Sequence, residues 1–342
     1  MTIIRRSWFA VLMSLVFLAG CSKAPAAGTE TSEVRIPRGA GGVGFLPLLV
    51  MEKYGLVEKQ AQAAGLPPLK VSWIPLGGPS VMNDALLSGS VDFIAAGPPA
   101  FLILWDRTRN AKKVMGVAAI ASLPMYLNTR SERLQKLDDI REGDKIAMTS
   151  VKVSIPAIIM QMYAAKKYGA SEATRFDQYT VTMTHPDGVV ALLSGGGAVT
   201  AHFTSAPFHQ RERKDPHIRT ILTSDEVMGG STTFTMLSTT SKFREQNPNA
   251  YMAVYKALEE AVQKIESDKR TAADILLESA SEGGLSRDEM ADLIGSSEVK
   301  FTLVPEHILK YAQFMKETGS IQMVPDSWKG FFFSESHALP GS

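Results

Sequence analysis

One glycine-rich segment has a spacing that could bind a phosphate-bearing cofactor. Gly39-Ala-Gly-Gly-Val-Gly44 matches the Gly-x-Gly-x-x-Gly pattern, whose glycines let backbone amides approach a pyrophosphate at the start of a helix. The pattern also requires an acidic residue about twenty positions later, at the end of the next strand. We expect that strand over residues 69–76, and it runs into Gly77-Gly-Pro79 without a carboxylate. An exported NAD-dependent oxidoreductase that uses Gly39–Gly44 is therefore an alternative and not the leading hypothesis.

The other reactive side chains form no recognisable catalytic or metal-binding set. The six histidines show no short ligand spacing such as an i, i+4 pair, so no metal is predicted. His202 and His209 flank a loop in the second half of the α/β pattern, and these two side chains could touch a ligand. A Gly-x-Ser-x-Gly nucleophile motif is absent, and the single cysteine, Cys21, lies close to the N-terminus. We therefore expect a protein that is not an enzyme and needs no cofactor.

Cys21 follows a segment typical of exported proteins. Arg5 and Arg6 precede an apolar run over residues 8–19 that is too short to span a membrane comfortably. Leu18-Ala-Gly-Cys21 resembles the lipobox of bacterial lipoproteins, in which the cysteine is lipidated and becomes the new N-terminus. The resemblance implies a signal peptide over residues 1–20, lipidation at Cys21 and a membrane anchor, followed by a flexible tether over residues 21–33. An ordinary signal peptide with an incidental cysteine is the alternative.

Composition limits the remaining possibilities. The 342 residues are 45% apolar and 21% charged, which is typical of a globular chain with about two domains. The 36 basic and 35 acidic side chains nearly balance, so the charge gives no reason to expect a nucleic-acid partner. One cysteine excludes a disulfide framework. We expect a monomer.

Short apolar runs alternate with helical patterns in two successive sets. The first set comprises strands at 34–36, 69–76 and 91–96 and helices at 44–57, 80–87 and 99–107. The second comprises strands at 145–149, 176–183 and 198–203 and helices at 155–168, 187–194 and 208–214. Such alternation is typical of parallel sheets, so the pattern predicts an α/β protein with two similar lobes.

The last third of the chain is mostly helical. Ser286-Arg-Asp-Glu289 fits a capping box that opens a helix. Trp328 and Phe331–Phe333 form an aromatic cluster, which we interpret as core packing, with a docking patch for a partner as the alternative.

Five segments together resemble a family of solute-binding proteins. These segments are 44–56, 84–94, 134–147, 191–195 and 201–207, and within the third of them Arg141–Asp144 departs from the family pattern. Their order and spacing are similar to those of the binding proteins of nitrate-, taurine- and aliphatic-sulfonate-type ABC importers, a family that also includes thiamine-pyrimidine binders. Where taurine-type relatives carry an aromatic residue before Ala-Pro, this chain has Ser205, which argues against taurine and against alkanesulfonates.

The resemblance implies a type II periplasmic-binding-protein fold, with two Rossmann-like lobes, a central ligand cleft and two hinge crossings. Lobe 1 would contain residues 34–126 and 225–342, and lobe 2 residues 127–224. Such a protein captures a small anion or polar solute in the periplasm and delivers it to a membrane permease and its ATPase. A binding protein that serves a signalling receptor would have the same fold.

The loops at the strand ends are the candidate ligand contacts. In open α/β sheets, ligands lie at the carboxyl ends of the strands, where helix N-termini present free backbone N–H groups. Applied to this sequence, the rule selects Gly44, Phe45, Gly78, Ser80, Gly97, Pro98, Ser150, Lys152, Ser154, Thr204, Ser205, Gly230 and Ser231. Phe45 and Pro98 could supply apolar walls. Lys152 is the one cation in this set and the candidate counter-charge for an anion.

Overall fold

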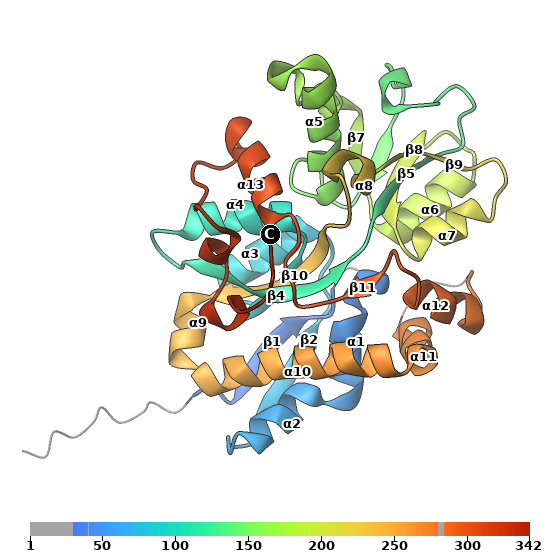
Figure 1. The fold of residues 1–342 in the computed structure, drawn as a ribbon. Coiled ribbons are helices and arrows are strands. Elements are labelled where there is room, and N and C mark those ends of the chain that lie inside the picture. The colour runs from blue at the N-terminus through green and yellow to red at the C-terminus, as the bar shows by residue number, and fades with distance from the viewer. Residues whose placement is uncertain (1–29, 40, 280–283) are drawn as a thin grey trace, which may run out of the picture.

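Helices and β-sheets form two lobes, one with sheets of two and four strands and the other with a sheet of five strands. The computed structural model describes residues 30–39, 41–279 and 284–342. The predicted signal peptide, Cys21 and the tether up to residue 29 lie outside the described residues. Figure 1 shows the green and yellow middle of the chain as the upper lobe, with the blue and orange segments below it.

Lobe 1 contains strands from both sides of lobe 2 in the sequence. Its strands are β1 (Glu33–Pro37), β2 (Lys70–Ile74), β3 (Phe93–Ala96), β4 (Val114–Ser122), β10 (Thr233–Thr240) and β11 (Lys300–Phe301). β1 pairs with β2 in parallel, and β10 lies antiparallel between β3 and β4. β1 lies beside β3, since the Asp92 amide donates to the Arg35 carbonyl at 2.9 Å. Lobe 1 therefore has two sheets, β2-β1 and β3-β10-β4-β11, which lie edge to edge in the spatial order β2-β1-β3-β10-β4-β11.

The five strands of lobe 2 have the same spatial arrangement as β2-β1-β3-β10-β4 of lobe 1, but they come from one continuous stretch of the chain. They are β5 (Met125–Thr129), β6 (Ile146–Met148), β7 (Thr180–Thr182), β8 (Ala201–Ser205) and β9 (Arg219–Thr223). They lie in the order β7-β6-β8-β5-β9, with β6 parallel to its neighbours and β5 antiparallel to β8 and β9. β5 and β10 are the first strands after the two crossings. β5 lies between β8 and β9, and β10 lies between β3 and β4. The chain crosses between the lobes from β4 to β5, and again before β10.

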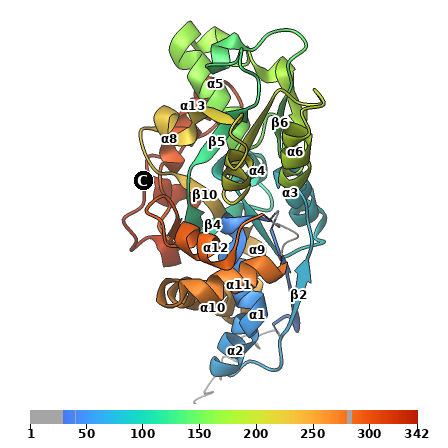
Figure 2. The ribbon, with the colours of Figure 1, turned by 90° about the vertical axis from the view of Figure 1, so that its right-hand side faces the viewer.

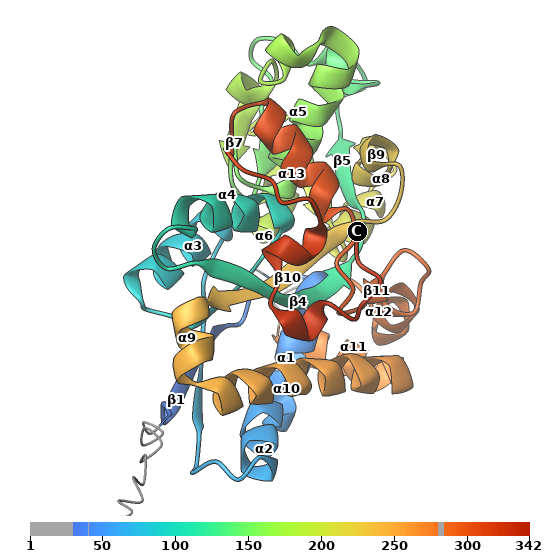
Figure 3. The same ribbon diagram turned by 60° about the vertical axis from the view of Figure 1, so that its left-hand side comes forward.

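Helices cover the sheets of both lobes. Those of lobe 1 are α1 (Leu46–Tyr54), α2 (Leu56–Ala63), α3 (Pro79–Ser88), α4 (Pro98–Thr108), α9 (Ser241–Gln246), α10 (Pro248–Ser267), α11 (Lys269–Ser279), α12 (Arg287–Ile294) and α13 (Ile308–Glu317). Those packed on lobe 2 are α5 (Ile155–Tyr168), α6 (His185–Leu193), α7 (Phe208–Arg213) and α8 (Ser224–Met228). Figure 2 shows α2 and α10 at the end of lobe 1 away from lobe 2, and Figure 3 shows α13 beside α4 and α5.

Local signals account for several helix ends. The helix expected over 44–57 is two helices, because Gly55 takes a left-handed conformation (φ 58°) that ends α1 and precedes α2. The capping box at Ser286 is confirmed: the Ser286 hydroxyl accepts from the Glu289 amide, and the Glu289 carboxylate accepts from the Ser286 amide. Within the described part of the chain, no helix combines the length and apolar character needed to cross a membrane.

The aromatic cluster near the C-terminus is part of the lobe 1 core, as expected. Phe331 is fully buried, and its ring meets that of Trp105 on α4 edge-on at 4.7 Å between centroids. Phe332 packs over Gly116 of β4, where a side chain would collide with its ring. The tail therefore closes the outer face of a strand that precedes it by more than two hundred positions.

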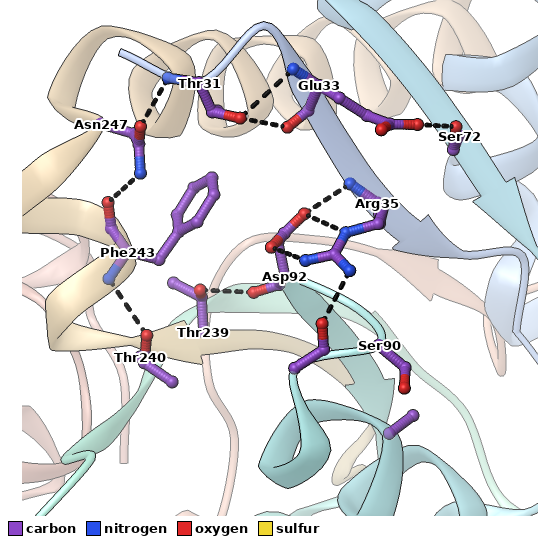
Figure 4. Close-up of polar contacts among 12 residues, drawn as sticks. Thr31, Glu33, Arg35, Ser72, Ser90, Asp92, Thr239, Thr240, Phe243 and Asn247 are labelled. Carbon is purple, nitrogen blue, oxygen red and sulfur yellow. Dashed lines mark hydrogen bonds and ion pairs between the residues drawn. The ribbon is translucent and has the colours of Figure 1, made fainter. Parts of the chain in front are cut away.

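One ion pair fixes the first strand to the loop before β3. The Asp92 carboxylate accepts from the Arg35 backbone N–H at 2.8 Å and from its Nε and Nη2 at 3.1 and 2.7 Å (Figure 4). Asp92 is mostly buried, with 15% of its side chain exposed, and the same Arg35 side chain also donates to the Gly89 carbonyl. The pair thus joins β1 to both sides of the turn that follows α3.

Asp92→Asn should lower the free energy of unfolding by about 1–2 kcal/mol, because the amide places an N–H against a guanidinium and removes the charge that three donors share. Urea unfolding measures the loss. Lys70→Met is the control, since the Lys70–Glu33 pair is exposed and solvent weakens its contribution to stability. Equal losses in the two variants would show that the Arg35–Asp92 pair has no special structural role.

Candidate ligand-binding site

Four helix N-termini meet between the lobes. In lobe 1 the N-cap residues of α3 and α4 are Gly78 and Gly97. In lobe 2 the N-cap residues of α5 and α6 are Ser154 and Thr184. Each helix has a proline in its first turn, which fits the fixed φ of that position without losing an internal hydrogen bond. The remaining N–H groups and the helix dipoles make this junction favourable for negative charge or for acceptor oxygens.

A small cavity lies at this junction. Its volume is about 40 Å³, room for about three water molecules. Most of its wall is apolar, formed by Phe45, Pro79, Met82, Ala95, Ala96, Gly97, Met125, Val153, Ile155, Pro156 and Phe234. The polar lining side chains are Thr149, Ser154 and His185, and no lysine, arginine or carboxylate lines it among the described residues. Such a wall suits a compact solute that is oriented by a few hydrogen bonds.

The lobes touch directly around the cavity. The Val43 amide of lobe 1 donates to the Ala206 carbonyl of lobe 2 at 3.2 Å, and the hydroxyls of Ser80 and Ser150 lie 3.4 Å apart. At Gly78 the backbones approach so closely that a Cβ would lie 2.6 Å from the Thr149 carbonyl oxygen. The structure is therefore a closed arrangement of the two lobes, and glycine is required where they meet.

Several of the residues expected at the strand ends lie at or next to this cavity. Phe45, Gly97 and Ser154 line it, and Pro98 follows Gly97 as a buried residue of α4. Three more, Gly78, Ser80 and Ser150, form the lobe contact beside it. Thr204 is buried behind the wall, and its hydroxyl lies 3.3 Å from Nδ1 of His185.

The remaining expected residues lie elsewhere. Gly44 packs beneath the Phe234 ring, and Ser205 is buried in β8 opposite Met125. Gly230 and Ser231 belong to the second crossing, where the Ser231 hydroxyl donates to the Glu306 carboxylate at 3.1 Å. Lys152 is exposed in a left-handed turn (φ 67°) and does not line the cavity.

His185 is the principal lining residue that the strand-end rule did not select. The strand expected over 176–183 also ends at this junction, and the same rule extended to its end points to Thr184 and His185 at the start of α6. Met82, Met125 and Phe234 carried no such signal, because apolar residues inside helices and strands look like ordinary core.

His202 and His209, expected as possible ligand contacts, lie behind this wall in a buried polar network. His202 Nε2 lies 3.2 Å from His185 Nδ1, and His202 Nδ1 lies 2.6 Å from Glu212 Oε1. Asn128 donates to Glu212 Oε2 at 2.7 Å and lies 3.1 Å from His209 Nδ1. Burial lowers the pKa of His209 to about 4, and its ring stacks on Tyr126 at 3.7 Å.

The glycine-rich segment lies at the mouth of the junction. Gly39, Gly41 and Gly42 line an open groove of about 790 Å³, together with residues from α1, α11 and the end of β2. β2 ends at Ile74 and continues as Pro75-Leu-Gly77, so this position carries no carboxylate for a ribose. No cluster of three histidine, cysteine or acidic side chains able to hold a metal occurs within the described ranges.

Two α/β lobes of the same strand order, two crossings and a cavity at facing helix N-termini define the class: this is the periplasmic-binding-protein fold, as the sequence predicts. The chain belongs to the NMT1-like family, whose pattern matches residues 42–277. No curated protein matches the sequence.

Solved structures share the fold at low sequence identity. The alkanesulfonate-binding protein SsuA from Xanthomonas axonopodis pv. citri, bound to MOPS, is 16% identical with a TM-score of 0.64, over 86% of this chain and 96% of that one. The periplasmic nitrate-binding protein NrtA from Synechocystis PCC 6803 is 14% identical with a TM-score of 0.65, over 91% and 86%. A Candida albicans gene product with the generic periplasmic binding protein fold is 14% identical with a TM-score of 0.62, over 86% and 92%.

Proposed function

We propose that this protein is the substrate-binding component of an ABC importer that captures a small anion or polar solute between its lobes. The observation that supports this most is the meeting of four helix N-termini at one cavity, with lining residues from both lobes. A ligand that contacts both lobes favours the closed arrangement, because only differential contact can shift the equilibrium between open and closed forms. The sulfonate- and nitrate-binding structural neighbours support the same solute class.

We propose that the two lobes move as two bodies, one close to residues 34–126 and 225–342 and the other close to residues 127–224, with the whole of β5 (Met125–Thr129) and α8 (Ser224–Met228) moving in the second body. The second crossing contains Gly229 and Gly230, both with positive φ, a conformation that favours glycine. α8 packs against α5, β5 and β9, which supports a pivot just after it. The two glycines are the residues best able to absorb the change in backbone angles.

In this proposal the mature protein is a periplasmic monomer, held to a membrane by lipidated Cys21. It delivers its solute to a permease powered by an ATPase. The sequence before residue 30 supports the anchor through its resemblance to a lipobox.

Thermal unfolding and small-angle scattering with a panel of solutes test the proposal. The panel comprises nitrate, methanesulfonate, taurine, a hydroxymethylpyrimidine and NADH. A ligand at a hundred times its Kd should stabilise the protein by about 2.7 kcal/mol without being consumed, and should shift the scattering profile toward the closed form. NADH oxidation with an added substrate would instead support the oxidoreductase. No response to any member of a wider metabolite library would overturn solute capture.

The Lys152→Ala variant tests whether the exposed lysine contributes to solute binding. Because Lys152 does not line the cavity, we expect nitrate affinity to fall less than about threefold at physiological salt, as for other exposed charges. Isothermal titration measures the change, with the exposed Lys166 replaced by alanine as the matched control on the same lobe. A tenfold loss confined to Lys152→Ala would mean that the side chain reaches the solute in solution.

A further inference from the structure

Three buried side chains form a continuous chain from the cavity wall into lobe 2. His185 lines the cavity and is 5% exposed, while His202 and Glu212 behind it are fully buried. The contacts run from His185 Nδ1 to His202 Nε2 at 3.2 Å, and from His202 Nδ1 to Glu212 Oε1 at 2.6 Å. The other carboxylate oxygen of Glu212 accepts from Asn128. Asn128 is fixed in this orientation, because its own carbonyl accepts from Thr220 at 2.7 Å.

The protons in this chain follow from the cost of burying a net charge. A carboxylate with no accessible surface requires a compensating positive charge or a proton of its own. Either Glu212 is ionised and His202 is an imidazolium, or Glu212 is protonated and donates to a neutral His202 at Nδ1. In both neutral arrangements Nε2 of His202 carries a hydrogen. His202 therefore donates to Nδ1 of His185.

This donation determines what His185 offers to the cavity. Burial, reinforced by the nearby His202, holds the pKa of His185 well below its ordinary value, so its ring is neutral. A neutral imidazole has one N–H, and Nδ1 of His185 is already the acceptor. The hydrogen must lie on Nε2, which forms no hydrogen bond with any residue in the described ranges.

We propose that Glu212 and His202 are positioning residues that hold His185 as a neutral hydrogen-bond donor in the cavity, so that the solute presents an acceptor oxygen to Nε2. This inference rests on the proposed capture of a solute and narrows its class. Among the described residues, no other side chain that lines the cavity has an N–H, and the four helix N-termini favour an acceptor as well. Anionic oxygens and carbonyl oxygens share this chemistry.

The absence of a side chain at Gly188 leaves room for the contact between His185 and His202. Gly188 lies one turn into α6, and a Cβ at this position would lie 2.5 Å from His202 Nε2. An alanine would therefore push the imidazole away from His185, although alanine favours helix over glycine. The small residue is needed by the contact between the two histidines and not by the backbone of the helix.

Nitrogen-15 NMR of the histidine side chains tests the inference on the mature protein without a ligand. The signals of His185 and His202 are assigned with single His→Gln variants. We expect Nε2 of His185 to be protonated and Nδ1 to be bare, and His202 Nε2 to carry a hydrogen. A His185 ring protonated at Nδ1 with bare Nε2 would overturn the inference while leaving solute capture intact.

Gly188→Ala and Gly196→Ala form a matched pair for the same test. Gly196 follows the same helix, and within the described part of the chain a Cβ there meets only the Ser194 hydroxyl, at an ordinary 3.7 Å. We expect Gly188→Ala to lose the single His185 tautomer and Gly196→Ala to keep it. If both variants keep the wild-type tautomer, His202 does not determine it.

Binding of small probes separates this inference from the proposed function. Nitrate, methanesulfonate and acetamide present acceptor oxygens, whereas methylammonium is a donor only. We expect one or more acceptors to bind, at least tenfold more weakly in Gly188→Ala than in Gly196→Ala, with acetamide distinguishing a carbonyl from an anion. Binding of methylammonium alone would overturn the inference. The expected tautomer together with no ligand at all would count against solute capture instead.

Discussion

Gly78→Ala should weaken solute binding by at least about a hundredfold, equivalent to about 2.7 kcal/mol, while both lobes stay folded. The added Cβ would lie 2.6 Å from the Thr149 carbonyl oxygen across the junction, and it would also meet the Ser150 hydroxyl at 3.0 Å. The first of these atoms belongs to the backbone and cannot rotate away. The variant should therefore be unable to reach the closed arrangement in which a ligand touches both lobes.

Gly77→Ala is the matched control, since a Cβ there meets no atom of the described residues within 4 Å. Isothermal titration with a solute identified by the thermal screen gives the affinity, and small-angle scattering with saturating solute reports whether the lobes close. We expect closure in Gly77→Ala and none in Gly78→Ala. Wild-type affinity in Gly78→Ala would mean that the bound form is more open than this structure.

Phe331→Ala should have the largest effect on stability, lowering the free energy of unfolding by about 3–5 kcal/mol. The ring is fully buried and packs against Trp105 and Phe101 of α4, so truncation leaves a cavity that these rigid rings cannot fill. Urea unfolding followed by tryptophan fluorescence measures the loss.

Met323→Ala provides the comparison on the same C-terminal segment. Its side chain is 52% exposed, so its truncation should change stability by less than about 0.5 kcal/mol. If Phe331→Ala cost no more than Met323→Ala, the aromatic tail would be an accessory to the core of lobe 1.

Much of the fold could be predicted from local patterns. The alternation of apolar runs and helical segments identifies β1, β2, β3, β6, β7 and β8 and the helices that follow them, but not β4, β5, β9, β10 or β11. Ser286 and Gly55 carry their own signals for helix ends. β5 and β10 are the strands that follow the two crossings. Only the resemblance to the family could predict their positions in the sheets. Their antiparallel pairing depends on contacts between distant residues, such as Met236 of β10 with Ala96 of β3, to which no local pattern points.

The site was less accessible to sequence reasoning. The strand ends and their glycines indicate where the two lobes meet, because residue types such as glycine directly reflect the local backbone geometry. Lys152 was chosen for its charge, yet the left-handed turn in which it lies leaves its side chain in solvent. The His185–His202–Glu212 chain could not be predicted, because its members lie on α6, β8 and α7 and gain their roles only when burial removes water from all three.

Lobe 1 is formed by two chain segments that lobe 2 separates, and this affects how the polypeptide folds during synthesis. Lobe 2 has all its strands once residue 223 has emerged, whereas β3 and β4 still lack β10 between them, and Val117 of β4 receives its hydrogen bond from Ser336, 219 positions later. Vectorial emergence should therefore let the inserted lobe mature early. The flanking one stays unfinished, with open strand edges that need protection from misassociation until the far segments arrive.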